Sequence, residues 1–143
     1  MAEKNIALIG NPNSGKTTIF NKLTGSSAKV GNWSGVTVEK REGILLGREE
    51  LKIVDLPGIY SLSAYSDDER IAKNYLLEKP DIVVDIIDAS NLKRNLYLTL
   101  QMLEMNQNLI LALNIMDVAN KKYEKIDLDL LSSLLGGLAI VPM

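Results

Sequence analysis

The chain of 143 residues contains neither cysteine nor histidine, and these two absences exclude several kinds of chemistry. Without cysteine there is no disulfide, no thiolate nucleophile and no zinc or iron–sulfur site held by sulfur. Without histidine there is no Ser-His-Asp triad, no imidazole base and no histidine-ligated metal centre. Any chemistry of this chain must therefore use carboxylates, hydroxyls, lysine, amides, backbone N–H groups or a bound ion.

A strong charge of either sign and a long apolar run are also missing. The net charge is −2 and the pI is about 5.2, which argues against a nucleic-acid partner. The uncharged runs at residues 105–116 and 130–143 are both shorter than the roughly 20 residues of a membrane-spanning helix, and the first contains several amides. The N-terminus leads directly into an apolar run, so we expect no signal peptide and a reducing, cytosolic setting.

Short apolar runs alternate along the chain with helix-like segments. Strands are expected at residues 6–9, 51–54, 82–87, 109–113 and 138–141, because unbroken apolar runs are typical of strands buried on both faces of a parallel sheet. Residues 36–46 alternate better and predict a hairpin that adds one antiparallel edge strand. Helices are expected at residues 16–23, 66–77, 92–104 and 127–135. This order predicts one doubly wound α/β domain with helices on both faces and its ligand at the carboxyl ends of the strands.

The first expected strand runs into Gly-Asn-Pro-Asn-Ser-Gly-Lys-Thr, residues 10–17, which matches the phosphate-binding pattern G-x-x-x-x-G-K-[ST]. The glycines let backbone N–H groups curl round a β-phosphate at the positive end of the following helix. Lys16 is expected to bridge the β- and γ-phosphates, and Thr17 to give its hydroxyl to Mg²⁺. A glycine-rich turn that only caps a helix is the alternative, but the match stands between a strand and a helix, as the phosphate-binding motif requires.

Two later loops favour guanine as the base. In Asp-Leu-Pro-Gly, residues 55–58, the Asp55 carboxylate would lie in the second coordination shell of Mg²⁺, and the Gly58 N–H near the γ-phosphate. In Asn-Ile-Met-Asp, residues 114–117, the Asp117 carboxylate can accept from the N1–H and the 2-amino group of guanine, whereas adenine offers neither donor. Each motif alone could be an ordinary turn or a helix cap. Their order after successive strands favours GTP over ATP.

The segment between the first helix and the hairpin, residues 26–38, is expected to be a switch. Thr37 could bind Mg²⁺ through its hydroxyl and the γ-phosphate through its N–H, but only while GTP is bound. Trp33 in the same segment is either an apolar anchor or part of a functional surface, and the sequence leaves both open.

The usual catalytic groups of such enzymes are missing. Ile59 follows the glycine of D-x-x-G, where Ras-type enzymes have a glutamine that orients water, and residues 26–38 contain no arginine. Hydrolysis is therefore expected to be slow unless a partner or an ion supplies positive charge. Asn13 could hold a monovalent cation against the phosphates, or it could only stabilise the turn.

Together these residues resemble the N-terminal G domain of the prokaryotic ferrous iron transporter family FeoB. The most specific stretches are Gly-Asn-Trp-Ser-Gly-Val-Thr-Val-Glu-Lys at residues 31–40 and Asp-Leu-Pro-Gly-Ile-Tyr-Ser-Leu at residues 55–62. Arg-Asn-Leu-Tyr-Leu-Thr at residues 94–99 and the N-x-x-D without lysine also agree. The resemblance covers essentially the whole chain and implies that residues 1–143 form a Ras-like P-loop GTPase domain.

The resemblance implies a potassium-stimulated GTPase that uses GTP or GDP, Mg²⁺ and K⁺. The K⁺ ligands it implies are Asn13 and backbone carbonyls at Gly31 and Trp33, and the cation would replace an arginine finger. The Mg²⁺ residues are Thr17, Thr37 and Asp55, and the catalytic residues are Asn13, Lys16, Thr37 and Gly58. The expected nucleotide contacts are Gly10, Asn11, Pro12, Asn13, Ser14, Gly15, Lys16, Thr17, Thr18, Gly35, Val36, Thr37, Asp55, Leu56, Pro57, Gly58, Asn114, Met116 and Asp117.

The resemblance also implies a longer intact protein. It would include a helical regulatory domain and a multi-pass membrane region that carries Fe²⁺ across the inner membrane, with this domain on the cytoplasmic face and self-association left open. Two departures from the family pattern matter. Ser34 stands where proline is usual, which predicts a more mobile first switch. The chain stops at Met143, before the family's last guanine-contacting loop and final helix, so we expect a truncated G domain.

Two other functions stay open at this point. A soluble Era-like GTPase of ribosome or tRNA maturation would share the phosphate-binding loop, the N-x-x-D and K⁺ use. It would also need a basic RNA-binding module, and the acidic balance speaks against that. A nucleotide-sensing module with negligible turnover is consistent with Ile59.

Overall fold

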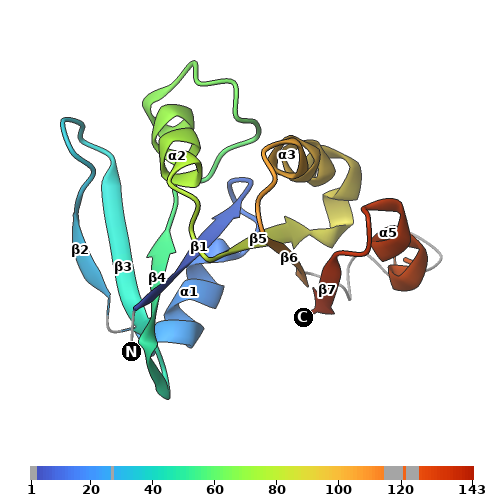
Figure 1. Ribbon diagram of the computed structural model, residues 1–143, viewed down its shortest axis with the longest axis horizontal. Helices are drawn as coiled ribbons and strands as arrows, with labels where there is room; N and C mark the ends of the chain where they lie inside the picture. The colour runs from blue at the N-terminus through green and yellow to red at the C-terminus, as the bar shows by residue number, and fades with distance from the viewer. Residues whose placement is uncertain (1–2, 27, 115–120, 122–125) are drawn as a thin grey trace.

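The strands form one mixed, seven-stranded sheet in the order β2-β3-β4-β1-β5-β6-β7 (Figure 1). The computed structural model describes residues 3–26, 28–114, 121 and 126–143. From β4 to β7 neighbouring strands are parallel, whereas β3 pairs antiparallel with both β2 and β4. The strands are β1 Lys4–Gly10, β2 Lys29–Asn32, β3 Glu39–Leu45, β4 Arg48–Asp55, β5 Ile82–Asp88, β6 Leu109–Asn114 and β7 Ala139–Pro142.

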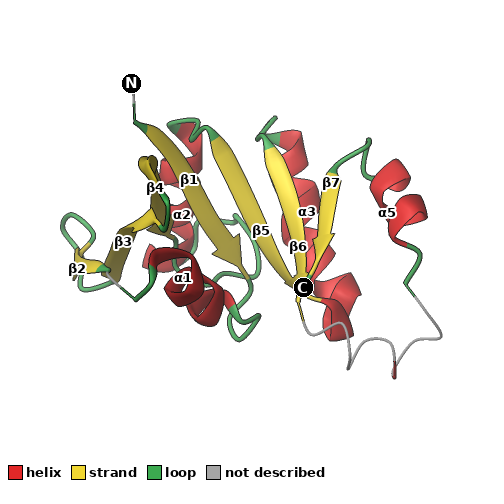
Figure 2. Ribbon diagram, turned by 90° about the horizontal axis from the view of Figure 1, so that it is seen from below, coloured by secondary structure: helices red, strands yellow, loops and turns green. Residues whose placement is uncertain are grey.

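Helices cover both faces of the sheet. Helix α1 lies on one face, and α2 and α3 lie on the other (Figure 2). Helix α5 lies beside β7 at the end of the sheet. The helices are α1 Lys16–Thr24, α2 Asp67–Leu77, α3 Leu92–Glu104 and α5 Leu128–Leu134, with a 3₁₀ turn, η1 Ala89–Asn91, before α3. The expected α/β fold class is confirmed.

The capping residues that the sequence predicts lie at the helix ends in the structure. At the start of α2 the Ser66 hydroxyl accepts from the Glu69 N–H at 3.2 Å, and the Glu69 carboxylate accepts from the Ser66 N–H at 3.1 Å. This reciprocal pair satisfies two N–H groups that the helix itself leaves without partners. Helix α1 ends at Gly25, whose φ of 66° few other residues adopt.

Separate apolar clusters on the two faces hold the helices to the sheet. On the face of α2 and α3, buried residues of the sheet pack with Ala72, Leu76, Leu98 and Met102. On the face of α1, Ile19 and Phe20 complete the cluster. In the part of the chain that the structure describes, no helix is long and apolar enough to cross a membrane.

The antiparallel edge differs in detail from the prediction. The sequence predicts one antiparallel strand over residues 36–46, but β3 begins at Glu39, and a further strand, β2, pairs beyond it. The four residues of β2, Lys-Val-Gly-Asn, are all exposed. Their sequence does not alternate between apolar and polar side chains, so it gives no signal for a strand. It is held by backbone hydrogen bonds to β3, in a register that places Gly31 opposite Lys40. The segment expected to be a switch therefore forms the edge of the sheet in this conformation.

Candidate functional site

The turn between β1 and α1 forms a tight loop at the carboxyl end of the sheet. A Cβ at Gly10 would lie 2.5 Å from the Ile86 carbonyl oxygen, so the loop can approach β5 this closely only with glycine there. Gly15 has a φ of 92°, and a Cβ there would overlap the side-chain amide of Asn114. Close packing of the loop therefore requires glycine at position 10, and the positive φ favours glycine at position 15.

A cavity of about 470 Å³ opens between this loop and the first turn of α1. It lies where the free N–H groups and the positive dipole end of α1 attract anions. Most of its lining comes from the loop predicted from the sequence. The lining residues are Asn11, Pro12, Asn13, Gly15, Lys16, Thr17, Thr18, Gly58 and Asp68.

Two of the expected site residues form an ion pair beside this cavity. The Lys16 Nζ donates to the Asp55 Oδ1, and the two side chains are only 11% and 9% exposed. Lys16 begins α1 and Asp55 ends β4, so the pair joins residues that lie 39 positions apart in sequence.

The loop after β4 lies directly against the phosphate-binding loop. The Ile59 N–H donates to the Gly10 carbonyl at 3.1 Å, and the Leu56 N–H donates to the Leu8 carbonyl at 3.0 Å. A Cβ at Gly58 would lie 3.2–3.4 Å from atoms of Pro12, so glycine lets the two loops touch. Ile59 is 3% exposed and belongs to the apolar core, so its side chain does not replace the missing glutamine.

The end of β6 is tied to the same loop. The Asn114 side-chain N–H donates to the Ser14 carbonyl at 3.0 Å. Asn114 therefore links the end of β6 to this loop. Met116 and Asp117 lie outside the described residues.

The expected switch segment does not line the cavity. Gly31 is paired within β2 and Thr37 is exposed. Trp33 packs edge-on against Tyr75 of α2 at 5.9 Å between ring centroids, and the Lys40 ammonium lies 4.7 Å from the Trp33 ring. Gly35 and Val36 likewise do not contribute to the lining. In this conformation Trp33 anchors the segment to α2, away from the phosphate-binding loop.

The oxygen ligands expected for Mg²⁺ fit that ion in part. The Asp55 carboxylate and the Thr17 hydroxyl are hard oxygen donors on adjoining elements, and Mg²⁺ prefers such ligands together with waters and phosphates. Thr37 is not near them among the cavity-lining residues. The described residues contain no group of three or more acidic side chains that could hold a metal, so Mg²⁺ here would depend on phosphate oxygens.

Of the residues expected to hold K⁺, Asn13 lines the cavity, whereas Gly31 and Trp33 do not. Asn13 lines the cavity with an exposed side chain and a φ of 63°. The Trp33 carbonyl accepts from the Val36 N–H at 3.3 Å, and Gly31 lies in β2.

The sequence prediction missed Asp68 as a cavity residue. Asp68 stands in the first turn of α2 and lines the cavity together with the loop residues. Its neighbour Glu69 accepts hydrogen bonds from Ser63, Ser61 and Ser66, and these bonds, that from Ser63 foremost, hold the pKa of Glu69 below its usual range. The acidic run 67–69 indicated only a helix start, because nothing local shows which carboxylate faces the loop.

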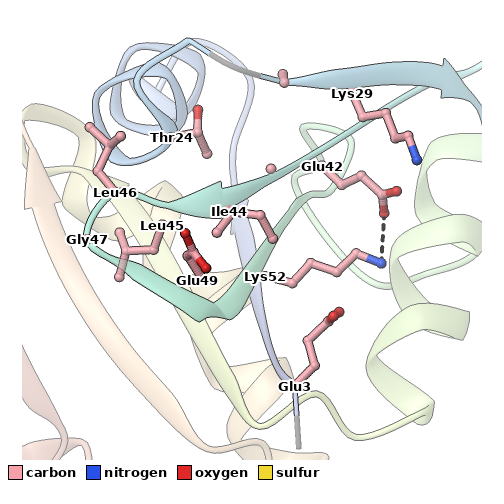
Figure 3. Close-up of a pocket in the computed structure, with 12 residues that line it drawn as sticks. Glu3, Thr24, Lys29, Glu42, Ile44, Leu45, Leu46, Gly47, Glu49 and Lys52 are labelled. Atoms are coloured by element: carbon pink, nitrogen blue, oxygen red, sulfur yellow. Dashed lines mark ion pairs between the residues drawn. The ribbon is translucent and has the colours of Figure 1, made fainter. Parts of the chain in front are cut away.

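A larger cavity, of about 730 Å³, lies at the other end of the strands, between the hairpin of β3 and β4 and the end of α1 (Figure 3). Its lining includes the ion pair of Lys52 with Glu42, 3.1 Å apart, and the apolar side chains of Ile44 and Leu46. None of the expected site residues lines it, and it has no helix N-terminus to attract phosphate.

Comparison with known proteins decides the family. A family model described as ferrous iron transport protein B matches residues 4–143. The chain belongs to the FeoB family. The Fe(2+) transporter FeoB of Salmonella typhimurium is 51% identical over an alignment that covers 100% of this chain and 19% of the relative. FeoB of Escherichia coli K12 is 52% identical, covering 95% of this chain and 18% of the relative. The chain thus spans about a fifth of the length of these curated FeoB proteins.

Solved structures of FeoB G domains have the same fold. A variant of the S. thermophilus NFeoB protein bound to mGDP has a TM-score of 0.94 and 48% identity, covering 99% of this chain and 55% of that one. The FeoB G-domain of Methanococcus jannaschii has a TM-score of 0.80 and 48% identity, covering 100% and 86%. The resemblance noted in the sequence is confirmed, and the chain is a FeoB G domain rather than an Era-like protein.

Proposed function

We propose that this G domain binds GTP and GDP together with Mg²⁺ and hydrolyses GTP slowly. The observation that carries the proposal is the cavity at the N-terminus of α1, lined by the glycine-rich loop and by Lys16. Its position suits a β-phosphate, since backbone N–H groups and an ammonium group converge there. FeoB structures of S. thermophilus bound to mGDP and GDP support the choice of guanine nucleotide.

Each expected residue has a part in this proposal. Lys16 neutralises phosphate charge. The Thr17 hydroxyl binds Mg²⁺ directly, and the Asp55 carboxylate lies in the second coordination shell of the ion. The Gly58 N–H lies near the γ-phosphate. Asp117 recognises the guanine base, and Asn114 fixes the end of β6 to the loop. Thr37 joins the site only after residues 29–38 leave the position they have here.

The proposed slow rate of GTP hydrolysis follows from the isoleucine side chain at position 59. The Ile59 side chain is buried and apolar, so it cannot orient the attacking water. Unassisted Ras, which has a glutamine at that position, turns over at about 10⁻⁴ s⁻¹. We expect a rate within one or two orders of magnitude of this value.

K⁺ is proposed as the source of the missing positive charge. Asn13 supports this, because its side chain lies exposed at the rim of the phosphate cavity. The remaining ligands, at Gly31 and Trp33, would have to come from a rearranged β2 segment. Binding of K⁺ and GTP would therefore be linked to release of Trp33 from Tyr75.

In the longer protein we propose that nucleotide state regulates Fe²⁺ uptake by an attached membrane transporter. The support is that curated FeoB relatives are about five times as long as this chain and are described as Fe(2+) transporters. The domain would then lie at the cytoplasmic face, contact its own helical and membrane domains, and be able to self-associate there.

A binding titration with a fluorescent GDP analogue tests the proposal. In the presence of Mg²⁺ the wild type should bind with saturation, and Lys16→Ala should lose tight binding. Lys121→Ala, which changes an exposed lysine, is the matched control and should bind as the wild type does. Unchanged affinity of Lys16→Ala would refute the phosphate role of Lys16. Phosphate release compared in KCl and NaCl then tests K⁺, and equal, near-zero rates in both salts would favour a nucleotide-sensing module.

A further inference from the structure

The segment after β4 is fastened to the rest of the fold at every third residue. The N–H groups of Leu56 and Ile59 donate to carbonyls of β1 at 3.0 and 3.1 Å, and the Leu62 N–H donates to the side-chain oxygen of Gln101 at 2.8 Å. The side chains of these three residues are 0%, 3% and 7% exposed and belong to one apolar cluster. Residues 56–62 therefore form a strap that is held to the sheet at one end and to α3 at the other.

Gln101 holds the end of the strap from a firmly packed helix. It lies on α3 between Leu98 and Met102, which are buried in the same apolar cluster as Leu62. The chain turns outward soon after this point, and Tyr65 is 89% exposed. The bond from Leu62 to Gln101 thus holds the backbone where it leaves the core, and a buried N–H that lost this acceptor would be costly to leave without a partner.

Gly58 lies inside the strap, between its fastened residues. It lines the phosphate cavity, and a Cβ at this position would lie 3.2–3.4 Å from atoms of Pro12. Under the proposed function, on which this inference rests, the Gly58 N–H lies near the γ-phosphate. A donor stabilises developing charge best when its position is fixed before the ligand arrives. The ties at both ends of the strap provide this fixed position.

We propose that Gln101 is a positioning residue for GTP hydrolysis. It holds the strap through the Leu62 N–H and so keeps the Gly58 N–H at the place where the γ-phosphate binds. Gln101 itself is not among the residues that line the cavity, so it acts through the strap and not by touching nucleotide. GDP has no γ-phosphate, so loss of this tie should weaken the binding of GTP and leave that of GDP unchanged.

Gln107 offers a matched control on the same side of the sheet. It is 7% exposed, and its side-chain N–H donates to the Leu76 carbonyl at 2.8 Å, a bond that joins the loop after α3 to the end of α2. The two glutamines thus use opposite groups, since Gln101 accepts and Gln107 donates. Glutamate keeps the acceptor and loses the donor. Gln101→Glu should therefore keep its bond, whereas Gln107→Glu should lose it.

The experiment measures the affinities for GDP and for a non-hydrolysable GTP analogue in Mg²⁺, and phosphate release at saturating GTP. In Gln101→Leu the affinity for the GTP analogue should fall about fivefold, which corresponds to the roughly 1 kcal/mol of one hydrogen bond. Phosphate release should slow by at least the same factor, and GDP affinity should not change. Gln101→Glu should restore both losses. Gln107→Leu and Gln107→Glu should lower the thermal stability but bind both nucleotides as the wild type does.

Three results would overturn the inference: equal effects of Gln101→Leu on the two nucleotides, a Gln101→Glu variant as impaired as Gln101→Leu, or the same GTP-specific loss in Gln107→Leu. If Gln101→Leu does not fold, Gln101→Asn decides, because its acceptor is one methylene further from the Leu62 N–H and should give the same GTP-specific loss. A wild type that binds neither GDP nor the GTP analogue would contradict the proposed function itself, which is a different result.

Discussion

The Asn114 side chain donates a hydrogen bond to the Ser14 carbonyl at 3.0 Å, although the two residues are 100 positions apart in sequence. This bond joins the end of β6 to the loop that lines the proposed phosphate cavity. Stability and nucleotide affinity should therefore both depend on Asn114.

Asn114→Ala should lower the free energy of unfolding by about 1 kcal/mol, the usual cost of one such hydrogen bond. It should also weaken GDP binding about tenfold or more, because the loop loses its tie to β6. Asn108→Ala is the matched control, since the Asn108 side chain donates a similar bond to the Asp81 carbonyl at 2.9 Å, before β5. The control should leave GDP affinity unchanged. Equal affinity losses in both variants would show that the Asn114 bond has no special part.

Gly15→Ala should abolish tight nucleotide binding. The added Cβ would overlap the Asn114 amide and would also require a φ of 92°, which strains any residue but glycine. Gly47→Ala provides the comparison, because Gly47 has a φ of 80° but open space around it. Gly47→Ala should cost only about 1 kcal/mol of stability and leave binding intact. A Gly15→Ala protein with wild-type affinity would contradict the proposed packing of the loop.

The buried carboxyl group of Asp85 should make the stability of the folded protein depend on pH in an unusual direction. Its side chain is 1% exposed in β5, and burial raises its pKa to about 7, partly offset by a hydrogen bond from the Thr99 hydroxyl. The folded state thus keeps a proton that the unfolded chain, with a pKa of 3.8, releases. Stability should fall as the pH rises from about 4 to about 7, by as much as about 4 kcal/mol.

Asp85→Asn should remove this slope and make the protein more stable than the wild type at pH 8, since an amide carries no charge to bury. Chemical denaturation at a series of pH values measures the effect. Asp81→Asn, which changes an exposed aspartate just before the same strand, should keep the wild-type slope. A flat wild-type profile between pH 4 and 7 would mean that Asp85 does not titrate in the expected range.

Trp33, the single tryptophan of the chain, should report the movement of the switch segment. Its indole packs on Tyr75 and against the core, so its fluorescence should shift to longer wavelength when a GTP analogue, Mg²⁺ and K⁺ draw residues 29–38 to the cavity. Tyr75→Ala should shift the emission without nucleotide. NaCl in place of KCl should give a smaller change. The same spectrum with and without the analogue would contradict the proposed rearrangement.

Much of the architecture could be predicted because its signals are local. The capping box at Ser66, the glycine after α1 and the apolar runs of the parallel strands each identify an element from a few neighbouring residues. The loop lining the cavity was likewise predictable, since its glycines, Lys16 and Thr17 form one contiguous motif.

What could not be predicted depends on contacts between distant segments. Strand β2 forms because β3 offers backbone partners, although its own four residues are exposed. Asp68 reaches the cavity through the packing of α2 against the sheet, and Trp33 meets Tyr75 across more than 40 residues of chain. The pairing of Lys16 with Asp55 likewise requires the three-dimensional arrangement of α1 and β4.

The central claim is that the cavity at the start of α1 holds a guanine nucleotide, and competition binding tests it most directly. A fluorescent GDP analogue is bound in the presence of Mg²⁺ and then displaced with GTP or with ATP. We predict that GTP displaces the analogue at concentrations at least a hundredfold lower than ATP requires, since a site built for the hydrogen bonds of one base discriminates strongly against another. Failure of the protein to bind the analogue, or equal displacement by both nucleotides, would contradict the account.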